Sequence, residues 1–451
     1  MAGLNTGTRQ RLRRVSRLPL VSPRMWLRRI VFWVGAVLVS AIAIGFAAAA
    51  DRAYSLCTSI TGPHPYAALL LAPGGLILCL VLTLRVFPGA QGSGIPQTIA
   101  AIRITDQDAV ARMLSLRIAF GKITLTLLGL ACGASIGREG PTVQVGASIM
   151  HTLGRWLRLP RHDLQRALVL AGGAAGIAAA FNTPLAGIVF AIEELSHSFE
   201  ARTSGTVFTA VIVAGATTLA LVGNYTYFGQ TSAELDVTTA LIAVPACSLA
   251  GGLAGGLFSA LLIGAARGLP GPVGRFLVRR PVVFAALCGL AIAALGIASD
   301  GQTYGTGYAQ ARSLVEGHAD LVRAYPLLKF AANLVSYFSG IPGGIFAPSL
   351  AVGAGIGAWV AEFLPGPQGA VVLLGMIAYF SGVVQAPITA TVIVLEMTDS
   401  QRVTVPLMAT AFLAFGVSRL VCRKPVYSAL AERFLAAQAR AQPMQATPPP
   451  V

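Results

Sequence analysis

The chain has 451 residues, of which 55% are apolar and 11% carry a charge. A soluble domain of ordinary composition is about 45–50% apolar and about 25% charged, so a water-facing surface cannot cover this many apolar side chains. The composition therefore excludes a soluble enzyme, a disordered chain and a fibrous protein. It predicts a protein whose solvent is the lipid bilayer.

The net charge of +16 comes from basic residues at both ends of the chain and between its apolar runs. Residues 1–29 contain eight arginines and no acidic residue, and the region after Gln401 is also basic. A protein that binds nucleic acid gathers its basic residues on one polar face instead. By the positive-inside rule we expect both termini to be cytoplasmic, and we expect no nucleic-acid partner.

Long uncharged runs follow one another along the chain. The first, Ile30–Ala50, is long enough to cross a bilayer as a helix of about 30 Å, whereas the apolar core of a signal peptide has only about 7–15 residues. We therefore expect a retained membrane helix. The longest runs contain internal Gly and Pro, which predicts tilted helices or pairs of short helices inside the membrane. The further runs are Tyr66–Leu84, Ala167–Ile192, Val237–Ala266 and Gly369–Leu395.

Small residues provide surfaces on which such helices can approach one another closely. The segment 251–256 (GGLAGG) is one of them, and it can pack either within the chain or between two subunits. The six cysteines show no CxxC spacing, which favours packing roles over a zinc site or a disulfide framework.

Two proline-anchored alignments of the chain with itself indicate an internal repeat of roughly 200 residues. The matched pairs, at offsets of 207 and 203, are Gly137 with Gly344, Pro141 with Pro348, Gly146 with Gly353, Gly172 with Gly375, Pro184 with Pro387 and Glu193 with Glu396. If each half crosses the membrane an odd number of times, the halves are inverted and a solute site lies between them at the midplane. We expect a basic cytoplasmic segment (1–26), two membrane repeats (27–232 and 233–436) and a disordered tail (437–451).

The segment Gly92–Pro96 (GSGIP) has the composition of a helix start. Ser93 suits the N-cap and Pro96 the first turn, and the glycines let a ligand approach the backbone amides. The unpaired N–H groups at a helix N-terminus form an anion site. A plain turn between two helices is the alternative.

The segment Gly137–Pro141 (GREGP) places a carboxylate directly before an apolar helix. An ionisable residue at membrane depth is expensive and indicates function. The Glu139 carboxylate can occupy the anion site itself and release it on protonation; the alternative is an Arg138–Glu139 ion pair in a loop.

The segment Gly343–Pro348 (GGIFAP) is the counterpart in the second half, without the acid. Its free amides at Ile345 and Phe346 can bind an anion directly, although a plain helix start also explains it.

Glu193 and Glu194 close an apolar run, where carboxylates commonly mark the membrane interface. A buried carboxyl group can instead trade protons near neutral pH. Because Glu396 matches Glu193 in the repeat, we interpret these two as structural. Tyr427 lies beside basic residues in a Lys-Pro-Val-Tyr sequence, as an aromatic-belt residue would.

Together these segments resemble the CLC family of chloride channels and chloride/proton exchangers, over about residues 27–436. The resemblance implies an all-α polytopic membrane protein, a homodimer with one pore in each subunit, built from two inverted repeats. It implies that Ser93, Ile345, Phe346 and Tyr427 bind chloride. It also implies that Glu139 is the gating glutamate and Glu194 the internal proton-transfer glutamate. The large cytosolic tail of eukaryotic members is not expected here.

The function expected from this resemblance is electrogenic chloride/proton exchange across a cell membrane. A prokaryotic origin is expected because only three of the 33 basic residues are lysines. Serine at position 93 favours chloride over nitrate. A passive, voltage-gated chloride channel of the same fold is the alternative, and Glu194 favours an exchanger. The five histidines form no HExxH sequence or close pair, so we expect no enzyme, no metal and no cofactor.

Overall fold

The computed structural model describes residues 23–157, 162–196, 201–223, 227–229, 235–268, 271–318, 321–398 and 400–441. Most of the expected basic segment and most of the expected tail therefore lie outside the described residues. Throughout the described part the regular elements are helices, with two isolated backbone bridges and no strand. The prediction of an all-α polytopic fold is confirmed.

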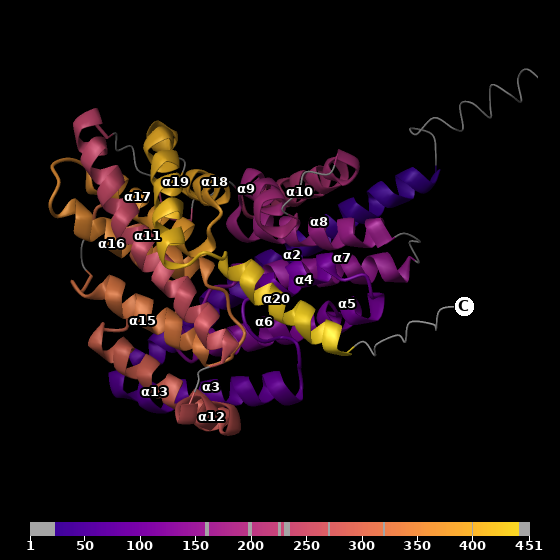
Figure 1. The fold of residues 1–451 in the computed structure, drawn as a ribbon, viewed down its shortest axis with the longest axis horizontal. Coiled ribbons are helices and arrows are strands. Elements are labelled where there is room, and N and C mark those ends of the chain that lie inside the picture. Colours follow the sequence, from indigo (N-terminus) through magenta and orange to yellow (C-terminus); the bar gives the residue numbers. More distant parts are fainter. Residues whose placement is uncertain are drawn as a thin grey trace, which may run out of the picture.

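The helices of the first half cluster beside those of the second, and the last helix, α20, crosses back over the first half (Figure 1). The first half contains α2 (Pro23–Thr61), η2 (Pro65–Ala67), α3 (Ala68–Arg85), α4 (Ile95–Arg103), α5 (Gln107–Met113), α6 (Leu116–Ala131), α7 (Glu139–Trp156), α8 (His162–Phe181), α9 (Pro184–Phe190), η3 (Ala191–Ser196) and α10 (Ala201–Val222). The second half contains α11 (Val237–Arg267), α12 (Gly271–Arg279), α13 (Pro281–Ala298), α14 (Tyr308–Val315), α15 (Tyr325–Phe338), α16 (Phe346–Ala361), α17 (Gln368–Val384), α18 (Pro387–Thr398), η4 (Gln401–Val403), α19 (Thr404–Val421) and α20 (Val426–Ala441).

In the described part of the chain, eight helical segments are long and apolar enough to cross a membrane, and α16, α17 and α18 are shorter apolar helices. Two of the expected long runs, Ala167–Ile192 and Gly369–Leu395, are each broken into two helices, at Pro184 and at Pro387. Val237–Arg267, in contrast, stays one helix despite its internal Pro245.

The two breaks are equivalent positions of the repeat. Asn182 and Gln385, each two residues before the proline that follows, adopt left-handed backbone conformations with φ of 56° and 60°. Proline has no N–H to continue a helix, and it disfavours helical conformation in the residue before it. The same local sequence therefore ends a helix twice in the same way.

The matched glycines of the repeat lie where two helices cross closely. A methyl group at Gly146 or Gly172 would collide with the backbone of the other, because α7 and α8 touch there. Gly353 and Gly375 form the equivalent contact between α16 and α17. The repeat in sequence thus corresponds to one helix crossing used in both halves.

The small-residue surface of 251–256 packs within the chain. Gly251 and Gly255 lie against the backbone of α17, while Gly252 and Gly256 lie against α19. The cysteines are all free and buried, as expected for packing residues.

Two carboxylates bind the two halves to each other reciprocally. Glu193, at the end of the first broken pair, accepts hydrogen bonds from the N–H groups of Ile388 (3.2 Å) and Thr389 (2.6 Å) at the start of α18. Glu396, at the end of the second pair, accepts from Leu185 (3.1 Å) and Ala186 (2.7 Å) at the start of α9. Each carboxylate thereby satisfies orphan amides at the positive end of the other half's helix.

We expect Glu193→Gln and Glu396→Gln to destabilise the protein by similar amounts, about 1–2 kcal/mol each, because each removes a charge that accepts two backbone hydrogen bonds. Thermal unfolding in detergent would measure both losses. Glu432→Gln is the control, since Glu432 pairs with Lys424 at the surface. A loss at only one of the two positions would contradict the reciprocal arrangement.

Candidate functional site

Three loops that precede helices are tied together by backbone hydrogen bonds. Gly137 and Gly344, a matched pair of the repeat, each donate to the other's carbonyl at 2.7 Å. Gly343 donates to the carbonyl of Gly92 at 3.1 Å, and Gly92 donates to that of Ile341 at 3.3 Å. The starts of α4, α7 and α16 therefore lie together, and their unpaired amides and positive dipole ends gather in one region.

Glycine is required where the first turn of α7 touches the loop before α4. A methyl group at Gly140 would lie 2.5 Å from Ser93 Oγ and 3.0 Å from the Ser93 carbonyl oxygen. The contact places the Ser93 hydroxyl directly on the start of α7. Gly344 also lies against this turn, since a methyl group there would be 3.1 Å from the Gly140 nitrogen.

Ser93 does not cap α4, and the expectation from its sequence position is wrong on this point. The N-cap is Gly94, whose backbone is left-handed with φ of 100°. Ser93 is only 1% exposed, and its hydroxyl has no hydrogen-bond partner in the described structure. Because a buried polar group without a partner is costly, this oxygen is available to a ligand.

Tyr427 is a second buried hydroxyl beside this region. Its side chain is 0% exposed, so the aromatic-belt alternative is wrong. Within the described residues the hydroxyl makes no well-formed hydrogen bond, and it lies next to the hydroxyl of Ser93. Its ring centroid is 5.7 Å from that of Phe346. Two neutral donors thus flank the helix starts.

Ile345 and Phe346 form the start of α16, with Ile345 at the N-cap. The first N–H groups of a helix have no partner within it, so these amides are donors without an internal acceptor. The Phe346 ring packs on Phe181, Phe190, Phe380 and Tyr427, with centroids 4.9–6.1 Å away. This aromatic cluster shields the polar region with an apolar wall. The structure therefore brings together all four residues that the sequence assigned to anion binding.

Two buried lysines support the loops, and their role was not predicted from the sequence. Lys122 donates to the carbonyls of Gln91 (3.2 Å) and Gly92 (2.8 Å). Lys329 donates to the carbonyls of Thr303 (2.9 Å) and Gly305 (2.8 Å). Both are fully buried, and they are 207 residues apart, the offset of the repeat. That shared offset was the available signal. Lys122 thereby holds the loop that contains Ser93 in place.

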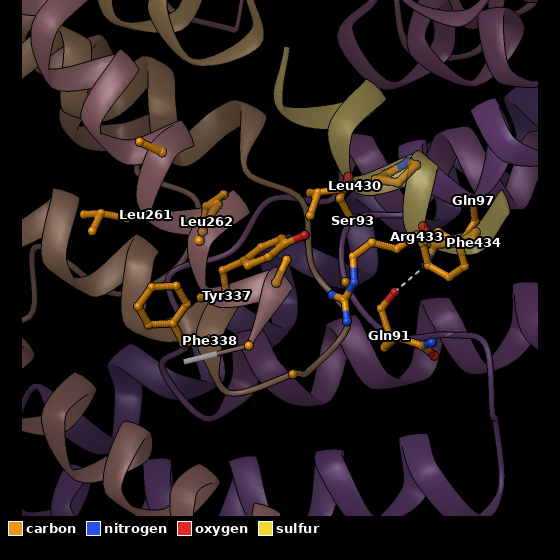
Figure 2. A pocket seen from close by; sticks show the side chains of 18 of the residues that line it. Gln91, Ser93, Gln97, Leu261, Leu262, Tyr337, Phe338, Leu430, Arg433 and Phe434 are labelled. Atoms are coloured by element: carbon orange, nitrogen blue, oxygen red, sulfur yellow. Dashed lines mark hydrogen bonds between the residues drawn. The ribbon is translucent and has the colours of Figure 1, made fainter. Parts of the chain in front are cut away.

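A cavity of about 770 Å³ leads from Ser93 towards the end of α20. Figure 2 shows the side chains of Tyr337 and Arg433 close to Ser93 around this cavity. Gln97 also lines it and donates to the Gln91 carbonyl at 2.6 Å. The exposed Arg433 gives the cavity a cationic entrance.

Glu139 is fully buried at the start of α7. Its Oε1 accepts a hydrogen bond of 2.6 Å from the Tyr308 hydroxyl, and its Oε2 has no partner in the described residues. The alternative of an ion pair with Arg138 is not what the structure shows. Arg138 instead donates to Asp51 Oδ1 at 2.6 Å and to the Ala47 carbonyl at 2.7 Å.

Tyr308 is a contact of Glu139 that sequence reasoning missed. It opens α14 directly after Gly305-Thr306-Gly307, which has the same pattern as Gly92-Ser93-Gly94. The first glycine of both segments has a φ of 66°. This second GxG segment marks Tyr308 as the start of a helix, but it gives no sign of the contact with Glu139.

Glu194 lies on the π-helical turn η3, 1% exposed, with one carboxylate oxygen unpartnered in the described structure. The turn packs against α4, and the carboxylate lies within electrostatic reach of Arg103 and Tyr427. Its neighbour Glu193 is directed instead to the start of α18. As expected from their angular separation on a helix, only one of the two carboxylates faces the interior.

Comparison with known proteins gives concordant results for sequence and fold. The sequence profile described as voltage gated chloride channel matches residues 74–419. An H(+)/Cl(-) exchange transporter ClcA of Yersinia pestis bv. Antiqua is 32% identical in an alignment 401 positions long, which covers 83% of this chain and 81% of the relative. The ClcA of Vibrio cholerae serotype O1 is 30% identical in an alignment 376 positions long, which covers 78% of this chain and 76% of the relative.

Two solved structures share the fold. A slow cyanobacterial Cl-/H+ antiporter superimposes with a TM-score of 0.76 at 24% identity, covering 92% of this chain and 99% of the other. A CLC-type fluoride/proton antiporter gives a TM-score of 0.75 at 23% identity, covering 90% of this chain and 98% of the other.

We expect Gly140→Ala to weaken halide binding strongly, because the added methyl group displaces Ser93 from the start of α7. Calorimetry on the detergent-solubilised protein would measure the binding. Gly45→Ala is the matched control, since a methyl group at Gly45 meets no atom within 4 Å. Halide affinity that survives in Gly140→Ala would show that this contact is not part of the site.

Proposed function

Because the chain belongs to the voltage-gated chloride channel family, we propose that it exchanges chloride for protons across a bacterial membrane. The names of the relatives support this proposal, since the ClcA proteins that match most of the chain are H(+)/Cl(-) exchange transporters. The observation that carries it is the burial of two carboxylates, Glu139 and Glu194, near one buried hydroxyl. Tyr427 lies within electrostatic reach of both Glu139 and Glu194.

Chloride is held between helix starts, by the hydroxyls of Ser93 and Tyr427 and by the amides of Ile345 and Phe346. The two hydroxyls are buried without partners in the described residues, so an anion would satisfy both. The dipoles of the assembled helices favour negative charge there. The cavity beside Ser93 supplies the route from the side of α20.

Glu139 acts as the gate. Its carboxylate lies at the start of α7, where an ionised side chain can compete with chloride for the same amides. Protonation removes the charge and frees the site for chloride.

Glu194 passes protons to this gate from the cytoplasmic side. A proton is disfavoured in the anion site, because the same positive potential that attracts chloride raises the energy of a proton there. The proton therefore needs a separate path. Glu194 lies off the cavity that leads to Ser93, on η3, which makes it suitable for a separate path. Exchange of opposite charges in opposite directions moves net charge, and each charge is worth about 2.3 kcal/mol per 100 mV.

The assembly that follows from the proposal is a homodimer with one pore in each subunit, in the bacterial inner membrane. Both termini are cytoplasmic, and the membrane repeats are residues 27–232 and 233–436. The reciprocal contacts of Gly137 with Gly344, and of Glu193 and Glu396 with the opposite half, support this division.

We expect Glu139→Gln and Glu194→Gln to stop proton movement while chloride flux continues. In Glu139→Gln chloride flux also loses its pH dependence, because the amide mimics the protonated gate. Simultaneous recording of chloride and protons in reconstituted vesicles measures both ions. Glu193→Gln is the control, since that carboxylate faces α18; its coupling should stay intact. A wild-type protein that moves chloride without protons would instead be a passive chloride channel.

We expect Ser93→Ala and Tyr427→Phe each to lower chloride affinity about two- to tenfold, since a neutral hydrogen bond contributes about 0.5–1.5 kcal/mol. Ser93→Pro should shift the preference towards nitrate. Calorimetry with chloride and nitrate would measure these changes. Tyr379→Phe is the control, because Tyr379 is equally buried and also lacks a hydroxyl partner in the described structure. Unchanged affinity in both site variants would contradict the chloride assignment.

A further inference from the structure

We propose that Tyr308 is a latch that holds the ionised Glu139 carboxylate away from the chloride site. The inference rests on the proposed role of Glu139 and adds a positioning residue from the other half of the molecule. Its consequence is that the ionised gate has two resting places, and that chloride competes with only one of them.

The position of the carboxylate supports this inference. Glu139 Oε1 accepts from the Tyr308 hydroxyl on α14 at 2.6 Å, and Oε2 lies over Gly137. The Ser93 hydroxyl lies against Gly140, farther along the first turn of α7. The carboxylate is therefore bound to α14, and among the described residues neither of its oxygens has a hydrogen bond to the proposed chloride ligands.

The ring of Tyr308 is itself fixed. It stacks on Tyr227 with centroids 5.0 Å apart and an interplanar angle of 27°, and it packs on Phe228 at 5.2 Å. The Arg138 guanidinium lies 5.5 Å from the centroids of both tyrosine rings. Arg138 is in turn anchored by hydrogen bonds to Tyr227 and Asp51. A hydroxyl on a ring held in this way can donate in a defined direction with little loss of side-chain entropy.

A hydrogen bond to a charged acceptor is about twice as strong as a neutral one, so the Tyr308 hydroxyl holds the carboxylate most strongly when that carboxylate is charged. The titratable groups that interact with Glu139 are Arg138 on its own segment, Tyr308 on α14 and Tyr427 on α20. Tyr227 and Asp51 on α2 bind Arg138 instead.

The latch is a property of one half of the molecule. Aligning the two GxG segments places Ile95 where Tyr308 stands, and isoleucine has no hydroxyl to donate. The first residue of the helix after Gly94 therefore cannot donate to Glu139 through its side chain, whereas the first residue of the helix after Gly307 does so through the Tyr308 hydroxyl.

Tyr308→Phe tests the latch, because it keeps the ring stack and removes only the hydroxyl. Without the latch, ionised Glu139 spends more time in the chloride site. We expect the apparent chloride affinity to fall about tenfold at about pH 8, and to fall clearly less at about pH 4.5, where a carboxyl group of ordinary pKa is about half protonated. Calorimetric chloride titrations at the two pH values measure the difference.

Two further variants make the result decisive. Tyr304→Phe is the matched control, since its buried hydroxyl points to the Ala293 carbonyl and not to Glu139; it should show no pH-dependent loss. In a Glu139→Gln background, Tyr308→Phe should have no effect on chloride affinity, because no carboxylate remains to compete.

The outcomes separate the latch from the proposed function. Wild-type affinity of Tyr308→Phe at both pH values, or an equal loss at both, would overturn the latch. A loss that persists in the Glu139→Gln background would overturn it as well. If Glu139→Gln itself retains the wild-type pH dependence of chloride flux, the gate assignment fails instead.

Discussion

The pair of backbone hydrogen bonds between Gly137 and Gly344 is the constraint on which the rest of the structure depends. Irregular backbone inside a membrane protein must be satisfied by protein, because lipid offers no hydrogen bonds. Here backbone groups in the loop of one half form hydrogen bonds with backbone groups in the loop of the other half. Three helices can therefore begin together in the interior, and the donors at their starts remain available for an anion.

The same reciprocity operates a second time at Glu193 and Glu396. Each carboxylate ends a broken helix pair in its own half and accepts from the first amides of the equivalent pair in the other half. Half-buried charge is tolerated there because it is met by helix dipoles and backbone donors. These contacts and the glycine pair join the halves through matching positions, which is what a two-fold relation between inverted repeats requires.

Two buried lysines and two buried glutamates differ in how completely their side chains are hydrogen-bonded. Lys122 and Lys329 are fully buried, yet each donates to two carbonyls and so stabilises the loops that surround the site. Glu139 and Glu194 each keep one carboxylate oxygen without a partner among the described residues. Incomplete satisfaction of a buried carboxylate is costly for stability, and it is also what allows a group to change its charge or its position.

The sequence alone determined the class of the protein, because its composition, apolar runs and repeated Gly-Pro segments follow from the demands of lipid on any chain. It also singled out Ser93, Glu139, Ile345 and Phe346, since each stands at or next to an expected helix start, whereas Tyr427 was added only by the family resemblance. It could not assign Ser93 its free hydroxyl or Tyr427 its buried position, because these depend on Gly94 taking the N-cap and on α20 folding back over the first half. The contact of Tyr308 with Glu139 could not be predicted from the sequence for the same reason. The two residues are 169 positions apart, and only the packing of one half on the other brings the Tyr308 hydroxyl to that carboxylate.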